Sequence, residues 1–177
     1  ATADALAHLP RMRGSEARAA AAAPAAGKRG NAHGLELADA APAPALASLQ
    51  AWALQQGQTQ LASLCLAYGA HTGNGFAAEL PGPTGESNTY SILPRARVLC
   101  LASSDADRLT QLAAVLAAGG QALWPAECEA LHQQLPEAVQ EHVSLVAQWQ
   151  AESVWFDAVL HHGDADALRA VCQAVAQ

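Results

Sequence analysis

The fold class of this chain is decided by residues 97–105, which read Arg97-Val98-Leu99-Cys100-Leu101-Ala102-Ser103-Ser104-Asp105. Residues 97–101 form a short, mostly apolar run that is typical of a buried strand. Ser104 can cap a following helix, and the Asp105 carboxylate suits the positive end of the helix dipole. The stretch therefore predicts a strand that turns directly into a helix.

The alternation of strand and helix continues on the C-terminal side. The helix ends at Gly119-Gly120, residues 121–124 form a second strand, and Pro125 opens a helix through Leu135. Residues 142–146 and 156–160 are further strand candidates, and Asp164 caps a last helix. The predicted apolar stripes of the first and last helices are Leu109, Leu112, Ala113 and Leu116, and Leu168, Val171, Cys172 and Val175. Alternating strands and helices predict an α/β fold with a mostly parallel sheet.

On the N-terminal side the composition changes. Residues 46–53 and 61–68 have a helical period interrupted near Gly57, and residues 76–80 and 89–93 are strand-like. Residues 1–44 are rich in Ala, Gly and Pro, which predicts a flexible linker or strap, with Leu35-Glu36-Leu37 the one place that could dock. We expect residues 45–177 to form one domain. Because the chain stops after a helix, we also expect it to be shortened at its C-terminal end.

Charge and hydropathy exclude several classes of partner. The chain has 177 residues, with 9 basic and 16 acidic side chains and a net charge of −7. An acidic chain repels a phosphate backbone, so nucleic-acid binding by this segment is not expected. No apolar run approaches the roughly 20 residues that a transmembrane helix needs, and no secretory signal is recognised. A cytoplasmic location is the expectation.

The cysteines and tryptophans indicate structural roles. Four cysteines lie far apart and fit neither a zinc site nor a disulfide framework, so we expect all four to be reduced and structural: Cys65, Cys100, Cys128 and Cys172. For Cys100, Cys128 and Cys172 we expect burial that raises the thiol pKa. Four tryptophans have no stacking period and are expected to fill the core or an interface: Trp52, Trp124, Trp149 and Trp155. No catalytic, cofactor-binding or metal-binding residue is assigned.

Two predicted strand ends are candidate ligand sites. The turn Ala102-Ser103-Ser104-Asp105 lacks the glycines of a dinucleotide-binding turn and carries an acid where phosphate would lie, and no P-loop occurs. His161-His162-Gly163-Asp164 follows a strand at the edge where open α/β sheets bind ligands. The plain interpretation is a strand end and a helix cap, and a metal or catalytic role is the alternative.

The turn-rich segment between residues 81 and 90 is the candidate docking loop. Its glycines permit unusual backbone angles, and several neighbouring side chains can form hydrogen bonds. A plain structural connection is the alternative. The candidate residues are Gly82, Pro83, Thr84, Gly85, Glu86, Ser87, Asn88 and Tyr90.

At this loop the sequence resembles the C-terminal domain of the long bacterial proline utilization A proteins. The resemblance covers about residues 46–175. It is carried by Gly82-Pro83-Thr84-Gly85-Glu86-Ser87-Asn88-Thr89-Tyr90, Leu93-Pro94-Arg95, Arg97-Val98-Leu99-Cys100-Leu101-Ala102, Leu109-Thr110-Gln111-Leu112-Ala113-Ala114-Val115-Leu116-Ala117, Gln121-Ala122-Leu123-Trp124-Pro125, Phe156-Asp157-Ala158-Val159, His162-Gly163-Asp164 and Leu168-Arg169-Ala170.

The resemblance implies a three-layer αβα, Rossmann-like domain of the aldehyde dehydrogenase superfamily. It implies a bifunctional parent that oxidises proline with FAD and the resulting glutamate semialdehyde with NAD, in the cytoplasm or peripherally at the inner membrane face. This segment would hold no cofactor. It would cover the substrate-channelling tunnel and contact the preceding dehydrogenase domains or a second subunit. Only Leu35-Glu36-Leu37 is similar to a catalytic motif of the superfamily. The two glycines that follow in that motif are replaced here by Ala38-Asp39.

Two other interpretations stay open at this point. One is a nucleotide- or small-acid-binding α/β module with sites near Ser103-Ser104 and at residues 161–164. The other is a free-standing interaction protein that uses the same fold.

Overall fold

A parallel sheet of four strands, in the order β5-β4-β3-β6, forms the centre of the fold. The computed structural model describes residues 43–176. The strands are β3 (Arg97–Ala102), β4 (Gln121–Pro125), β5 (Val143–Val146) and β6 (Ala158–His162). Counted from β3, the spatial order is 3-2-1-4, as in doubly wound sheets, in which the connections change direction beside the first strand. The predicted α/β fold with a parallel sheet is confirmed.

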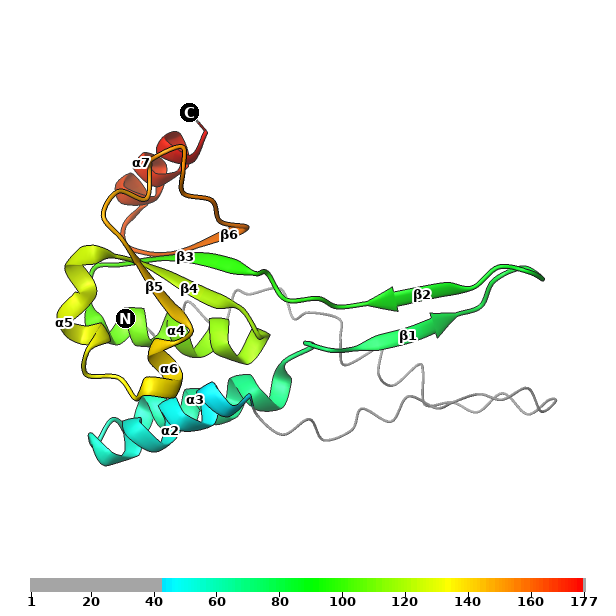
Figure 1. Cartoon of the computed structure of the whole chain (residues 1–177), viewed down its shortest axis with the longest axis horizontal. Helices are drawn as coiled ribbons and strands as arrows, with labels where there is room; N and C mark the ends of the chain where they lie inside the picture. The colour runs from blue at the N-terminus through cyan, green and yellow to red at the C-terminus, as the bar shows by residue number, and fades with distance from the viewer. Residues whose placement is uncertain (1–42, 177) are drawn as a thin grey trace. The chain divides into compact units, whose positions relative to one another are not determined.

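Helices lie on both faces of this sheet. Figure 1 shows α4 (Asp105–Ala118), with α2 (Pro44–Gln55) and α3 (Thr59–His71) beyond it, on one face, and α7 (Ala165–Val175) on the other. The three-layer arrangement is therefore present. The helical segment predicted ahead of the sheet is α2 and α3, which are separated at Gly57.

The core lies between the sheet, α4 and the α2–α3 pair. Trp124 of β4 and Leu112 of α4 are fully buried, as is Leu49 of α2. α4 begins and ends where its sequence predicts: the Ser104 side chain accepts a hydrogen bond from the backbone N–H of Asp107. Gly119 adopts a left-handed φ of 80° at the C-cap, which glycine reaches without a Cβ penalty. The linker predicted over residues 1–44, with its docking candidate Leu35-Glu36-Leu37, lies almost wholly outside the described residues.

Two elements differ from the sequence predictions. The single helix expected from Pro125 to Leu135 is a 3-10 turn, η2 (Ala126–Cys128), and a one-turn helix, α5 (Glu129–His132). Another one-turn helix, α6 (Glu137–Gln140), follows Pro136. Pro136 has no N–H and disfavours a helical conformation at Leu135, so the chain turns instead.

α7 is the second difference. Its predicted apolar stripe is not covered by the fold: no residue of α7 is buried, and Leu168 and Val175 are each 47% exposed. Cys172, expected to be buried, is exposed. The helix itself forms as predicted, since the Asp164 carboxylate accepts hydrogen bonds from the backbone N–H groups of Asp166 and Ala167.

The two strands before the sheet pair with one another. β1 (Ala77–Leu80) and β2 (Asn88–Ser91) form an antiparallel hairpin in which Leu80 lies opposite Asn88. The candidate docking loop thus connects two strands of a separate, two-stranded sheet. In Figure 1 this hairpin extends away from the parallel sheet.

Candidate functional site: an exposed hairpin and a crevice at the sheet edge

The hairpin presents its side chains to solvent. Every residue of β2 is exposed, and β1 changes from half-buried to exposed toward the loop. Leu80 and Tyr90 are 52% and 53% exposed, and Leu93, just beyond β2, is 78% exposed. Large apolar side chains gathered on one extended element mark an interaction surface more often than isolated ones do.

The hairpin is nevertheless ordered by its own contacts. The Phe76 and Tyr90 rings meet edge to face with centroids 6.2 Å apart, a favourable aromatic geometry. In the loop, the backbone N–H of Glu86 donates to the Pro83 carbonyl, and Gly85 has a φ of 94° that other residues rarely adopt. The candidate docking residues therefore form a defined turn with exposed side chains.

A second feature is a crevice of about 420 Å³ at the carboxyl edge of the parallel sheet. It lies beside the ends of β3 and β6, at the point where the order of strand connection reverses. Open α/β sheets bind ligands at this point. Its polar and aromatic lining comprises Ser103, Arg108, Glu127, Trp149, His161, His162 and Asp164.

The helix N-termini at this edge are occupied by the chain's own acids. Ser104 and Asp107 close the start of α4, with the Ser104 hydroxyl donating to the Asp107 carboxylate over 2.7 Å. Asp164 closes the start of α7 with two hydrogen bonds. A phosphate needs those free N–H groups and an approach without carboxylates, so neither helix start fits one.

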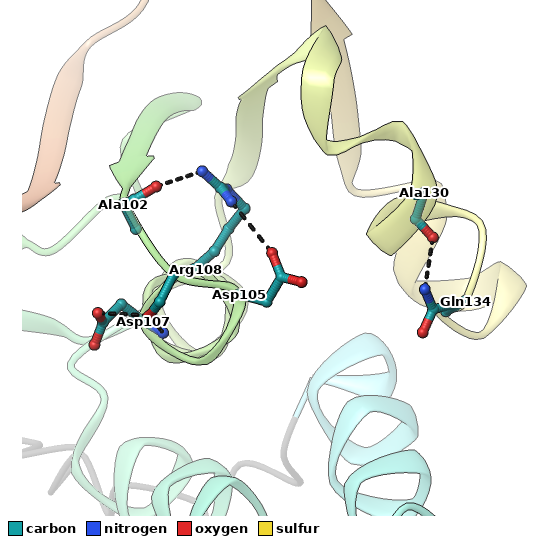
Figure 2. Close-up of polar contacts among 7 residues, drawn as sticks. Ala102, Asp105, Asp107, Arg108, Ala130 and Gln134 are labelled. Carbon is teal, nitrogen blue, oxygen red and sulfur yellow. Dashed lines mark hydrogen bonds and ion pairs between the residues drawn. The ribbon is translucent and has the colours of Figure 1, made fainter.

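Arg108 is the buried charge of the crevice, with 7% of its surface exposed. Its guanidinium turns back from α4 to donate to the Ala102 carbonyl at the end of β3, and its Nη1 lies 3.6 Å from the Asp105 carboxylate (Figure 2). Its Nε has no partner among the described residues. The positive charge is therefore partly neutralised within the protein, while one donor is left over.

The two histidines have different surroundings. His161 lies opposite Leu101 in the sheet and has both ring nitrogens buried without partners among the described residues. Its Nε2 would be only 2.7 Å from a Cβ at position 163, so the ring occupies space that Gly163 leaves open. The His162 Nδ1 lies 3.4 Å from the Gln111 Nε2 of α4. In the described part of the chain, no group of three His, Cys, Asp or Glu side chains could hold a metal ion.

The buried thiols are poor nucleophiles. Burial raises the pKa of Cys65 to about 11 and that of Cys100 to about 12, and it also raises the pKa of Cys128. With a raised pKa, these thiols stay protonated near neutral pH. They react poorly because the thiolate is the nucleophilic form. The predicted burial is confirmed for Cys100 and Cys128, and Cys65 is buried as well, whereas Cys172 is exposed.

The structure brings together residues that the sequence treated separately. Ser103-Ser104 and residues 161–164 were predicted as separate alternative sites, and the structure places Ser103 and residues 161–164 in the lining of one crevice. Arg108, Glu127 and Trp149 were not singled out for chemistry. Glu127 carried a usable signal, because an acid after the second strand is a known feature of dinucleotide-binding folds. The hairpin residues do not reach this crevice lining.

Comparison with known proteins identifies relatives. No family model matches the chain. It is 50% identical over 135 residues to the bifunctional protein PutA of Escherichia coli strain K12, a match covering 74% of this chain and 10% of that protein. The bifunctional PutA proteins of Salmonella typhimurium strain LT2 and Klebsiella aerogenes are 47% and 44% identical over 133 residues, with the same coverage of each chain.

These matches cover only a small part of much longer proteins. The chain spans about a tenth of the length of the curated relatives it matches. None of the described helices is long and apolar enough to cross a membrane. The chain is homologous to a segment of bacterial bifunctional PutA.

Proposed function

We propose that this chain is a noncatalytic segment of a bifunctional enzyme that oxidises proline to glutamate. In the proposal, the segment covers the tunnel through which the intermediate passes and supports contacts with the preceding dehydrogenase domains or a second subunit. FAD and NAD are bound by those other domains. The observation that carries the proposal is the 50% identity to a segment of bifunctional PutA.

The chemistry of the described residues supports a noncatalytic role. A dehydrogenase acting on an aldehyde through a thiol needs a thiolate beside a hydride acceptor, whereas burial raises the pKa of Cys100 to about 12. The helix starts that would hold a cofactor's pyrophosphate are capped by Ser104 and Asp164 instead.

The hairpin supports a docking role. Its loop and β2 are exposed, and three large apolar side chains on or beside it face solvent: Leu80, Tyr90 and Leu93. Burying such side chains against a partner is favourable by about 25 cal/mol per Å² of apolar surface. A projecting hairpin can therefore bind a neighbouring domain while the parallel sheet stays outside the contact.

The experiment compares coupled and separate reactions. In a full-length bifunctional PutA that carries this segment, residues 45–177 are deleted and NADH formation from proline is followed. We expect a lag and a lower coupled rate, because the intermediate escapes from an uncovered tunnel. Each half-reaction, measured with its own substrate, should keep its rate. A coupled time course without a lag would contradict the proposal.

A point variant isolates the hairpin from the rest of the segment. Leu80→Ser with Leu93→Ser removes exposed apolar surface, keeps the contact between Phe76 and Tyr90, and should reproduce the lag without loss of stability. The matched control is Leu54→Ser with Leu66→Ser, which changes comparably exposed residues, 55% and 59%, on α2 and α3. If the control pair produced the same lag, the effect would not belong to the hairpin.

A further inference from the structure

We propose that the crevice at the carboxyl edge of the sheet binds an uncharged nucleoside, through its ribose hydroxyls and its base, and rejects the same molecule when it carries phosphate. This goes beyond the docking role, which does not involve the crevice. The observations behind it are the position of the crevice, its capped helix starts, one free carboxylate, and the buried Arg108 Nε and His161 ring nitrogens, which have no partner among the described residues.

Position and size suit a small organic ligand. The crevice lies at the reversal point between β3 and β6, where doubly wound sheets bind ligands. Its volume of about 420 Å³ falls within the range of roughly 300–1,000 Å³ that is usual for ligand pockets. Its walls combine converging polar groups with apolar residues. The apolar residues include Pro125, Ala167 and Val171.

The rejection of phosphate follows from the capped helices. In dinucleotide-binding sheets, the pyrophosphate lies on the helix that follows the first strand, reached through a glycine-rich turn. Here that helix is α4, and its start holds Ser104, Asp105 and Asp107. Asp164 takes the N–H groups of α7 in the same way. A phosphate entering the crevice would meet the Asp164 and Glu127 carboxylates of its lining, and the chain's net charge of −7 adds to the repulsion.

The ribose would be held by Glu127. This residue follows β4, the second strand of the doubly wound order, about where an acidic side chain accepts hydrogen bonds from ribose hydroxyls in such folds. Its side chain is exposed and forms no ion pair among the described residues. The carboxylate is therefore free to accept from a neutral diol.

The base would lie against Trp149, with its polar edge toward Arg108 and His161. An indole ring offers a flat apolar surface on which bases stack. The Nε of Arg108, a residue with 7% of its surface exposed, and both His161 nitrogens lack partners, and buried polar groups are normally paired. The His161 ring packs on Gly163, and its nitrogens form no hydrogen bond among the described residues, so they keep their capacity to bond to a ligand.

Isothermal titration of the full chain with adenosine, adenosine monophosphate and NAD tests this. We expect adenosine to bind with one site per chain, and each phosphate-bearing compound to bind at least about tenfold more weakly. No binding of adenosine up to about 10 mM, or tighter binding of either phosphate compound, overturns the proposal.

Variants locate the site. Glu127→Gln should weaken adenosine binding about tenfold or more, whereas the matched control Glu129→Gln, two residues further on and outside the crevice lining, should not. Thermal unfolding of both variants shows that the fold is kept. Equal affinities in the two variants would place the nucleoside elsewhere and overturn the assignment. The assay does not use the proline reactions, so its failure would leave the docking proposal unaffected.

Discussion

One cysteine per chain should react rapidly with a thiol reagent in the native state. Burial raises the pKa of Cys100 from 9.0 to about 12, so its thiolate fraction at pH 8 falls about 1,000-fold. For Cys65, whose pKa is raised to about 11, the fraction falls about 100-fold. Limited access to the buried sulfurs lowers these rates further. Cys172 on α7 is exposed, so a reagent can reach its sulfur directly.

The assay is reaction with an aromatic disulfide at pH 8, followed by the absorbance of the released thiol. We expect one rapid equivalent and three slow ones, and all four equivalents at once in denaturant. Cys172→Ser should abolish the rapid phase, whereas Cys100→Ser should leave it unchanged. Two or more rapid equivalents in the native chain, or a rapid phase surviving in Cys172→Ser, would refute the burial on which this reasoning depends.

Three further predictions concern stability and are measured by chemical denaturation. Ser104→Ala removes the cap of α4 and should cost about 1 kcal/mol, whereas Ser103→Ala, beside it and exposed, should cost less than about 0.5 kcal/mol. Leu112→Ala, at a fully buried position, should cost about 2–5 kcal/mol, and Leu168→Ala, 47% exposed, less than about 1 kcal/mol. Between pH 9 and about 12, the Cys100 thiol ionises in the unfolded chain but stays protonated in the folded chain, so the free energy of unfolding should fall by up to about 1.4 kcal/mol per pH unit. A free energy of unfolding that rises with pH over this range would contradict the prediction.

The part of the fold that the sequence predicts best is locally encoded. The strand at Arg97 and the cap at Ser104 are fixed by neighbouring residues, as is the helix end at Gly119, and all three occur as expected. The single helix expected from Pro125 to Leu135 was wrong, because the chain forms a 3-10 turn and then one helical turn that ends at His132. Pro136 disfavours a helical conformation at Leu135, and that proline was visible in the sequence. Strand, cap and helix-end signals that agree with one another therefore predict the local structure best.

Features that depend on distant contacts could not be predicted in this way. The period of α7 indicates an apolar face but not whether anything covers it, so its exposure was missed. The crevice depends on strand order, which places Ser103, Glu127 and His161 together although they are far apart in sequence. The pairing of β1 with β2 also depends on the strand register, which the loop conformation sets: Leu80 lies opposite Asn88 only when the turn has formed.

The central claim is that the segment acts through its hairpin and without chemistry of its own. The most direct test replaces residues 81–87 by Asn-Gly, which joins Leu80 to Asn88 by a two-residue turn and keeps both strands. In a full-length bifunctional PutA carrying this segment, we predict a lag in NADH formation from proline while both half-reactions keep their rates. A time course identical to that of the unaltered enzyme would contradict the claim.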